Sequence, residues 1–536
     1  MVGENVILYF SVLVAAVFIR CLTLWVYRRR LSAGLIGDAA GHYSFIRAII
    51  EQKGKYKGVP EWLIADRDDH YPILFHRFAA LWGLPVLERY PFLPNVCVFA
   101  LALIMFMTGM SWGFLGEGGK EPVTIALAVG LMFSLPGNLI LTGDSILYAG
   151  LSERSMARLF TSLFFLGSYG FVTYEGGVAL VYASICGGIA LCTALFARQA
   201  ILFVTVVWSV FQADANALLP LFGAILFAAL IDRKYFFESI KDQFEFSYVY
   251  SRRMKVSKYW QNILSRFLSW RRVLSPRTSV ADKREELEKR EPTQSLFKCP
   301  EVYVVLFLSA AYFRSSELGE VVFLIIAVFF VYILISTPKL TQFGEAVRYP
   351  EYVLSMIAPA WIAVIWTQES LPRVGLYVLW GYLGFVALLV LLNLSRIREE
   401  AAAKDHWDGL RACLVVAGIN SRHGVFTVPF SLGWVCSAAT KCRSLTFQGV
   451  SFNVTLYDEF FEEFPFLKKD WVLLAKAHDL THVVIRDAEQ DAQRELLGWE
   501  YDFSALGEPI TFDGFSVYRI PTELLLSSSL CEKDVC

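Results

Sequence analysis

Long apolar runs, separated by polar loops, cover the first three quarters of the chain. Apolar runs of about 17 to 25 residues match the hydrocarbon thickness of a bilayer when they are helical. About eleven runs approach this pattern, some of them short, so we predict a mainly α polytopic transmembrane helical bundle. The predicted spans are 6–27, 94–115, 122–141, 159–172, 177–196, 200–211, 217–231, 302–313, 321–335, 352–366 and 374–392.

The pattern changes near residue 398, and we predict a transmembrane domain over 1–397 and a soluble α/β domain over 398–536. Strand-like runs at Cys413–Ile419, Gly424–Phe430 and Thr481–Asp487 alternate there with a helix-like stretch, Phe460–Ala477. The Asp513–Gly514 pair near the end predicts a β-hairpin turn.

Composition supports the membrane assignment. Hydrophobic residues make up 56% of the chain, charged residues only 18%, and the mean hydropathy is +0.48. A soluble protein carries closer to about a quarter charged residues. The first apolar run is long enough to span and lacks a small-residue cleavage site, so no cleavable signal peptide is expected. Cys436 and Cys442 are close enough in sequence to form a disulfide, and no zinc-site spacing is present.

A basic segment, 233–298, separates the two halves of the predicted bundle. It holds 16 Lys/Arg and 8 Asp/Glu, interleaved with aromatic residues. This pattern is typical of an amphipathic segment that contacts anionic lipid headgroups. Nucleic-acid binding needs a folded aromatic platform, and no such module is visible, so we expect no nucleic-acid partner.

Candidate chemistry gathers in two polar loops, 28–93 and 142–158. The first loop carries three of the seven histidines together with several aspartates. Two stretches of it, 41–52 and 71–82, have apolar residues near helical spacing, and we expect these helices to lie along a membrane surface. An acidic, histidine-bearing loop at a bilayer suggests a reaction on a lipid-linked substrate.

Four motifs give the chain a resemblance to a known superfamily. They are GDAAGHYSFIRAI (37–49), YPILFHRFAALWG (71–83), LSERSMARLF (151–160) and FGEAVRYPEY (343–352). In this order they resemble polytopic glycosyltransferases of the GT-C fold, which include oligosaccharyltransferase-like and dolichyl-phosphate-sugar-dependent enzymes. The WWDYG-type motif of true oligosaccharyltransferases is absent. The resemblance therefore implies sugar transfer from a polyprenyl-phosphate-linked donor to a lipid or glycan acceptor, but not protein N-glycosylation.

The resemblance also implies roles for individual residues. Asp38 matches the acidic position of the first loop, where a carboxylate accepts the proton of the acceptor hydroxyl; an N-cap for the helix that follows is the alternative, and the two roles can coexist. Arg348 matches a basic position that binds the lipid phosphate, for which a bidentate guanidinium is suited. The other expected substrate-binding residues are His42, His76, Asp144, Glu153, Arg154, Glu345 and Tyr349.

A divalent cation, Mg²⁺ or Mn²⁺, is a candidate cofactor. The DRDDH run offers oxygen and imidazole ligands of the kind that divalent cations bind. Its ligands would be Asp66, Asp68, Asp69 and His70. A solvated acidic loop without a metal is the alternative.

The two lines of evidence on sidedness disagree. The resemblance implies a multi-pass protein of the cell (inner) membrane, with the catalytic loops and the soluble domain on the external, periplasmic face. Lys and Arg, however, gather on that same face, at 28–30, 233–298 and 396–398, and the positive-inside rule would make it cytoplasmic.

Two other functions remain open. A transporter or flippase of lipid-linked saccharides would concentrate polar residues and broken helices near the middle of the membrane. A non-catalytic GT-C relative would present its soluble domain to partners. The charged residues cluster in loops at one face, which favours the enzyme.

Overall fold

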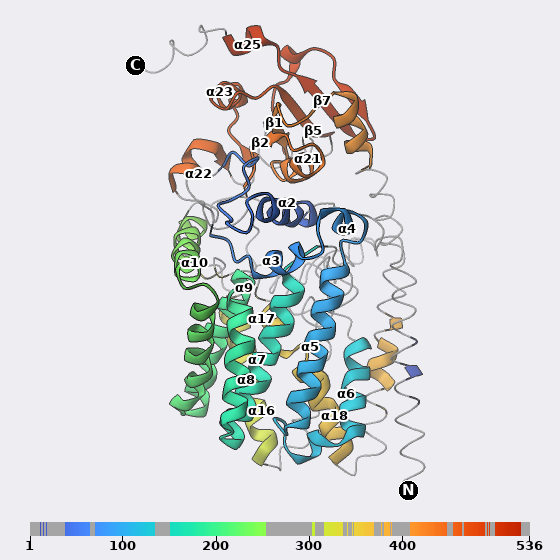
Figure 1. Cartoon of the computed structure of the whole chain (residues 1–536), viewed down its shortest axis with the longest axis vertical. Helices are drawn as coiled ribbons and strands as arrows, with labels where there is room; N and C mark the ends of the chain where they lie inside the picture. Colours follow the sequence, from blue (N-terminus) through green and yellow to red (C-terminus); the bar gives the residue numbers. More distant parts are fainter. Residues whose placement is uncertain are drawn as a thin grey trace, which may run out of the picture.

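The structure is a computed structural model with a helical bundle at one end and an α/β domain at the other (Figure 1). It describes residues 11, 14–15, 18, 38–64, 70–134, 151–252, 303–305, 316–335, 340, 343, 346, 348–368, 377, 380–385, 387–388, 408–447, 454–463, 466–487, 490, 493 and 499–526.

The helices of the bundle run roughly parallel to the long axis (Figure 1). The described bundle helices are α5 (Leu93–Ser111), α6 (Pro122–Ser134), α7 (Arg154–Tyr174), α8 (Gly177–Leu191), α9 (Leu195–Gln212), α10 (Leu219–Arg252), α16 (Ser316–Ile335), α17 (Arg348–Leu354) and α18 (Ile357–Gln368). Short 3₁₀ turns, η1 (Glu117–Lys120) and η2 (Ala215–Leu218), precede α6 and α10. Most of these helices begin or end within a few residues of the predicted spans.

Helix α7 lies inside the bundle, because every residue from Ser155 to Gly170 is buried. It packs closely on α8, and glycine permits this approach. A Cβ atom at Gly167 would lie 2.9 Å from the backbone nitrogen of Ala183. Small residues at such contacts let helix backbones come close together.

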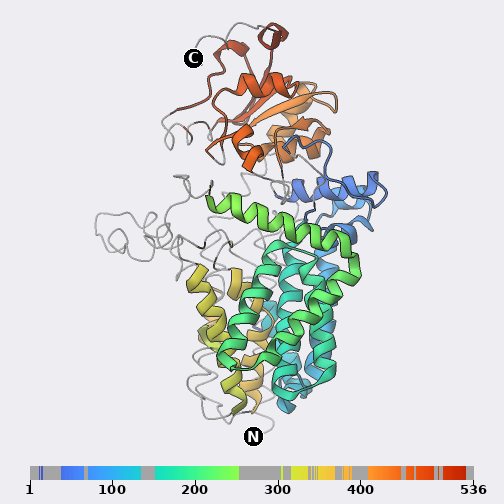
Figure 2. The same ribbon diagram turned by 90° about the vertical axis from the view of Figure 1, so that its left-hand side faces the viewer.

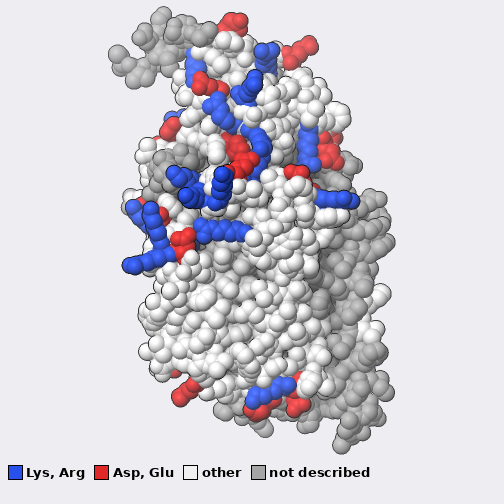
Figure 3. Space-filling view, viewed as in Figure 1, with Lys and Arg blue, Asp and Glu red and all other residues white. Residues whose placement is uncertain are grey.

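Within the described residues, three helices are long and apolar enough to cross a membrane, and a bent pair would make a fourth. The predicted number of eleven spans is therefore not confirmed, and the predicted spans 6–27, 302–313 and 374–392 lie largely outside the described residues. Charged side chains are scarce over the middle of the bundle and gather near its two ends, mostly towards the α/β domain (Figure 3). This distribution fits a membrane-embedded bundle.

The predicted span 352–366 is wrong as a single helix. Helices α17 and α18 meet there at an angle of 54°. The hydroxyl of Ser162 on α7 donates to the carbonyl of Val353 over 2.8 Å and accepts from the amide of Met356 over 3.0 Å. One buried side chain thus satisfies backbone groups that the break leaves without helical partners.

Helix α10 changes direction at Asp232, whose φ of −160° and ψ of 85° are not helical. Its second half runs across the end of the bundle (Figure 2). Phe237, Phe244 and Tyr248 are exposed on this half. The spacing of seven and four residues places them on one face, which also carries the exposed Lys241, so aromatic and basic side chains share the exposed face of this half. Residues 253–298 lie outside the described residues.

The first polar loop forms a layer between the bundle and the α/β domain (Figure 1). It contains α2 (Asp38–Glu51), α3 (Leu74–Ala80) and α4 (Leu84–Arg89). The expectation that the helix at 41–52 lies along a membrane surface is wrong, because protein covers it on both sides: α2 packs on α3 and on α21 (Leu432–Thr440). The guanidinium of Arg47 is buried and donates to the carbonyls of Ser437 and Ala438.

The same loop also pairs with a sheet edge in the α/β domain. The amide of Ser444 donates to the carbonyl of Glu61 over 2.8 Å, and the amide of Leu63 donates to the carbonyl of Ser444 over 3.0 Å. Trp62 and Ser444 thereby form an isolated parallel bridge. The first loop and the α/β domain are joined through backbone hydrogen bonds.

The α/β domain contains a five-stranded sheet in the order β2-β1-β5-β7-β6. Its strands are β1 (Gly424–Val428), β2 (Arg443–Ser444), β5 (His482–Arg486), β6 (Ile510–Phe512) and β7 (Phe515–Arg519). Strands β2, β1 and β5 are parallel, and β7 and β6 are antiparallel to their neighbours. The predicted strands at 424–430 and 481–487 and the hairpin at Asp513–Gly514, where both residues have positive φ, are confirmed.

Three sequence-based predictions for this domain are wrong. Residues 408–416 are helical, so Cys413–Ile419 is not a strand; a short apolar run does not distinguish helix from strand by itself. Phe460–Ala477 is not one helix, because α22 (Val454–Phe460) and α23 (Trp471–Ala477) flank a small hairpin of β3 (Phe461–Glu463) and β4 (Phe466–Leu467). Cys436 and Cys442 are both free thiols.

Candidate functional site

A buried chain of polar side chains lies where the first loop meets the bundle. His42 lies on α2, His76 on α3, and Glu153 directly precedes α7. Nδ1 of His42 lies 2.9 Å from Nε2 of His76, and Nε2 of His42 lies 2.7 Å from Oε2 of Glu153. The Tyr71 hydroxyl donates to Oε1 of Glu153 over 2.8 Å. The result is a continuous hydrogen-bonded chain, Tyr71–Glu153–His42–His76.

Aromatic packing fixes this arrangement from one side. The ring of Phe45, fully buried on α2, stacks on Tyr71 at a centroid distance of 5.1 Å and lies 4.9 Å from the ring of His76. Trp62 meets the same Phe45 ring edge-on. Offset and edge-on contacts of this kind orient rings specifically.

The electrostatics favour an ionised Glu153. Burial by itself raises the pKa of the Glu153 carboxyl, but the neighbouring His42 imidazole and the Arg154 guanidinium lower it by more, so the pKa lies well below its ordinary value. Burial, with Glu153 beside it, raises the pKa of the Tyr71 phenol well above the ordinary value. Burial, followed by the neighbouring His42 imidazole, lowers the pKa of His76 to about 3. Tyr71 therefore stays a donor, and His76 stays neutral at physiological pH.

The hydrogen-bonded series Tyr71–Glu153–His42–His76 is open at its His76 end. Nδ1 of His76 is buried and has no hydrogen-bond partner among the described residues. An unpaired buried polar atom costs free energy, and such atoms in native proteins often mark a place for a ligand, ion or water.

The same group has the donor set of a metal site. Ligand atoms of His42, His76 and Glu153 lie within 4.8 Å of one another. Two imidazoles and a carboxylate are a common ligand set for transition-metal ions. In the present arrangement both His42 nitrogens are engaged, so a cation would have to replace one of these hydrogen bonds.

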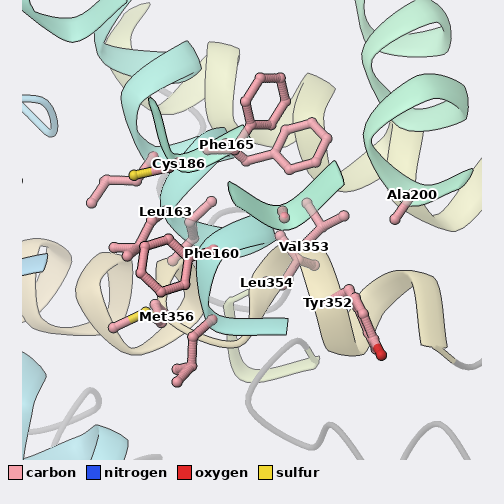
Figure 4. Close-up of a cluster of buried hydrophobic side chains, with 14 of the residues drawn as sticks. Phe160, Leu163, Phe165, Cys186, Ala200, Tyr352, Val353, Leu354 and Met356 are labelled. Carbon is pink, nitrogen blue, oxygen red and sulfur yellow. The ribbon is translucent and has the colours of Figure 1, made fainter. Parts of the chain in front are cut away.

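Two arginines lie near the hydrogen-bonded series around Glu153. The side chain of Tyr352 on α17 is within electrostatic reach of Arg348, Arg154 and Glu153. The Arg348 guanidinium lies 4.6 Å from the centre of the Phe196 ring and is almost entirely buried. The Tyr352 hydroxyl points away from the other labelled side chains of the buried apolar cluster (Figure 4).

A buried ion pair holds the two helices that carry these groups. Arg158 on α7 donates to Glu351 on α17 over 2.5 Å, and both side chains are buried. The Tyr349 hydroxyl donates to the carbonyl of Phe343 over 3.0 Å, which braces the start of α17. The side chains of Arg158 and Tyr349 are thus engaged in contacts that hold α7 and α17 in place.

Of the sequence-predicted site residues, the structure brings together His42, His76, Glu153 and Arg154. Arg348 lies near Tyr352, which is also near Arg154 and Glu153. His70 lies elsewhere, with Nδ1 2.9 Å from Asp242 and Nε2 2.9 Å from Glu238 of α10. Asp38 begins α2, one turn before His42, and its side chain is not described. The remaining predicted residues, Asp66, Asp68, Asp69, Asp144 and Glu345, lie outside the described residues.

Tyr71, Glu351 and Tyr352 also belong to this region, although the sequence did not single them out as site residues. All three lie inside or beside the quoted motifs, which is the one signal that points to them. Their partners, Glu153 for Tyr71 and Arg158 for Glu351, are distant in sequence, and only the fold reveals the pairing.

Known structures share this fold. ArnT from Cupriavidus metallidurans in the apo state superposes with a TM-score of 0.53 and 11% identity, over 95% of this chain and 98% of that chain. The same protein bound to undecaprenyl phosphate gives 0.52 and 12%, with the same coverage. The apo oligosaccharyltransferase of Archaeoglobus fulgidus gives 0.50 and 11%, over 90% of this chain and 70% of that chain.

No family model and no curated protein sequence matches this chain. The structural similarity nevertheless shows the GT-C fold that the sequence motifs implied.

Proposed function

We propose that this protein is a membrane glycosyltransferase that moves a sugar from a polyprenyl-phosphate-linked donor to a lipid or glycan acceptor. The observation that carries the proposal is the buried, hydrogen-bonded group Glu153–His42–His76 at the junction of bundle and first loop, with Arg154 beside Glu153 and Arg348 near the neighbouring Tyr352. A similarly folded protein, ArnT, has been crystallised with undecaprenyl phosphate, which supports a polyprenyl-phosphate ligand.

The reaction is a displacement at the anomeric carbon of the donor sugar. The acceptor hydroxyl forms the new C–O bond, the bond to the phosphate oxygen breaks, and the lipid phosphate leaves with the electron pair. A carboxylate takes the hydroxyl proton, and we assign this role to Asp38. We assign binding of the departing lipid phosphate to Arg348, because its guanidinium can donate two parallel hydrogen bonds to phosphate oxygens.

The hydrogen-bonded group Glu153–His42–His76 would position the reactants, and it would not itself supply the general base. His42 lies on α2 one turn after Asp38, so the hydrogen bond from His42 to Glu153 fixes the helix that carries the proposed base. His76 offers its open Nδ1 atom to a ligand.

A divalent cation fits the same residues. His42, His76 and Glu153 would hold it, and the bound cation would supply Lewis-acid stabilisation of negative charge on the leaving phosphate. Imidazole ligands favour Mn²⁺ or another transition metal over Mg²⁺, which prefers oxygen.

A transporter of lipid-linked saccharides is the second candidate, since the break between α17 and α18 is a feature that transporters also use. The experiment that separates the two uses purified protein in lipid vesicles with a labelled polyprenyl-phosphate sugar. Transfer of label to a new acceptor supports the enzyme. Movement of the intact donor across the bilayer, with no new product, contradicts it.

A further inference from the structure

A groove lies at the end of the bundle farthest from the α/β domain, where α5 and α7 end and α8 begins (Figure 1). Its cavity has a volume of about 510 Å³, and small-molecule sites typically occupy about 300 to 1,000 Å³. Trp112, Phe114, Tyr174 and Val178 form its walls, and none of the residues that line it is charged. The groove is therefore a candidate binding site for a largely apolar molecule. It is separate from the group around Glu153, which lies where the bundle meets the first loop.

Close packing fixes the inner wall of this groove. Phe114 lies against α7 because Gly170 has no side chain: a Cβ atom there would lie 2.8 Å from the Cβ atom of Phe114. The Phe114 ring meets the Tyr182 ring of α8 edge-on at a centroid distance of 5.1 Å. The Tyr182 hydroxyl donates to the carbonyl of Met105 over 2.9 Å, so it joins α8 to α5. The shape of the groove therefore rests on side chains that are held by their own neighbours.

The rim of the groove carries two exposed aromatic side chains. Trp112 is 54% exposed and Tyr174 is 39% exposed. Trp and Tyr gather at the level where the hydrocarbon of a bilayer meets its headgroups, because each has an apolar ring and a polar atom. Helix α5, which ends directly before Trp112, is long and apolar enough to cross a membrane. We therefore place the groove at the headgroup level of the membrane face away from the α/β domain.

Two apolar strips lead from the groove towards the middle of the bundle. On α5, Met105 and Leu101 lie seven and eleven residues before Trp112, which is close to two and three helical turns, so these side chains share one face. On α8, Val178 and Val181 are three residues apart, so they also share a face, and both are exposed. An acyl chain that begins in the groove can thus continue along surfaces that face the lipid.

The charges at the mouth of the groove have both signs. Glu175 is exposed, lies between two of the lining residues, and has no ion-pair partner among the described residues. Lys120 reaches over Gly113, where a Cβ atom would lie 3.2 Å from its Nζ atom, and this Nζ donates to Glu117. An ammonium has three donors, so Lys120 can also bind a phosphate. A headgroup with an ammonium and a phosphate matches these charges, whereas Glu175 would repel a purely anionic headgroup.

We propose that this groove binds a zwitterionic membrane phospholipid with a primary amine, of the phosphatidylethanolamine class. Its ammonium group lies beside Glu175, its phosphate lies beside Lys120, and one acyl chain follows Trp112 and Val178 onto the lipid-facing strips. The uncharged lining accounts for the chain, and the two opposite charges at the mouth account for a headgroup that carries both. The proposal does not depend on the proposed glycosyl transfer.

The test measures lipid retention by the full chain in detergent with native mass spectrometry. Phosphatidylethanolamine, phosphatidylglycerol and diacylglycerol are offered at equal concentrations, and wild type should retain one phosphatidylethanolamine in preference to the other two. Val178→Trp fills the groove from an exposed position and should weaken retention by about tenfold or more, the equivalent of about two buried methylene groups. The matched control is Val210→Trp, an equally conservative change at an exposed valine of α9, which should behave as wild type.

A second variant tests the headgroup separately from the chain. Glu175→Gln keeps the size of an exposed side chain and removes its charge, so it should reduce the preference for phosphatidylethanolamine over phosphatidylglycerol by about two- to fivefold. Wild-type retention in Val178→Trp, an unchanged preference in Glu175→Gln, or equal retention of diacylglycerol would overturn the proposal. A dimer in wild type that Val178→Trp converts to a monomer would assign the groove to a second copy of the chain and would also overturn it.

Discussion

His42 connects Glu153 to His76: one ring nitrogen lies 2.7 Å from the carboxylate and the other 2.9 Å from the second imidazole. The three side chains come from three separate segments, α2, α3 and the turn before α7. These two hydrogen bonds therefore connect the first loop to the bundle. Substitution of any of the three residues tests how much this connection matters.

Asp38→Asn should abolish sugar transfer and leave the protein folded in the membrane. An amide cannot take the hydroxyl proton, and loss of a general base typically costs about a hundred- to ten-thousandfold in rate. The measurement is turnover by purified protein with a lipid-linked sugar donor. Asp408→Asn, an exposed aspartate of the α/β domain, is the matched control. Wild-type turnover in Asp38→Asn would remove Asp38 from the mechanism.

His76 should make the protein less stable below neutral pH. Its pKa is about 3 in the folded protein and near the ordinary 6.5 when unfolded, so between these values the unfolded chain binds the extra proton. Stability should therefore be complete above pH 6.5 and fall with decreasing pH, by up to about 1.4 kcal/mol per pH unit. Melting temperatures of wild type and His76→Gln between pH 4.5 and 7.5 test this. Equal slopes for the two proteins would contradict it.

Elemental analysis of the purified protein distinguishes the two candidate metal sites. If His42, His76 and Glu153 hold a cation, Glu153→Gln should lose it, and His70→Gln should keep it. If the 66–70 run holds the cation, the two variants should exchange these results. A wild-type protein without stoichiometric metal after purification in Mn²⁺ would exclude a tightly bound cation at either place.

Arg348 should act on the donor and not on the acceptor. Arg348→Ala should weaken apparent donor affinity or slow phosphate departure, and Arg348→Lys should restore only part of the loss, because an ammonium lacks the planar pair of donors. The measurement is a donor titration at fixed acceptor. Arg422→Ala, an exposed arginine of the α/β domain, serves as control. If Arg348→Ala titrates as wild type, the donor phosphate must be sought near Arg154 or His42.

Arg47 should stabilise the contact between the first loop and the α/β domain. It is 2% exposed and, besides its two carbonyl acceptors, pairs with Glu61 over 2.9 Å. Arg47→Ala leaves these acceptors without a buried donor, which should cost about 3 to 5 kcal/mol. Lys441→Ala breaks the exposed pair with Glu51 in the same interface and should cost about 1 kcal/mol or less. Thermal unfolding, with limited proteolysis of the α/β domain, compares the two variants.

The sequence predicted well what depends on local pattern. Helices α6 and α8 begin at Pro122 and Gly177, as the apolar runs indicate, and the Asp513–Gly514 turn forms the expected hairpin. The spacing of apolar residues predicts which face of a helix is buried, but it does not predict whether lipid or protein covers that face. Helix α2 has the expected apolar face, but α21 rather than lipid covers part of it.

The candidate site was predictable as a set of residues but not as an arrangement. His42, His76 and Glu153 all lie in motifs that the resemblance singles out. No local signal indicates that His42 would lie between the other two, or that His70 would turn away towards Asp242 of α10. These pairings depend on how the loops pack on the bundle.

The backbone pairing of Glu61 and Leu63 with Ser444 has a topological consequence. Partners joined by direct hydrogen bonds lie in the same compartment, so residues 61–64 and 443–446 are on one side of the membrane. The chain must then cross the bilayer an even number of times between them. Any helix assignment with an odd number of crossings in that interval is excluded, and a reporter fused after residue 526 should have the same accessibility as one inserted near Gly54, an exposed turn of the first loop.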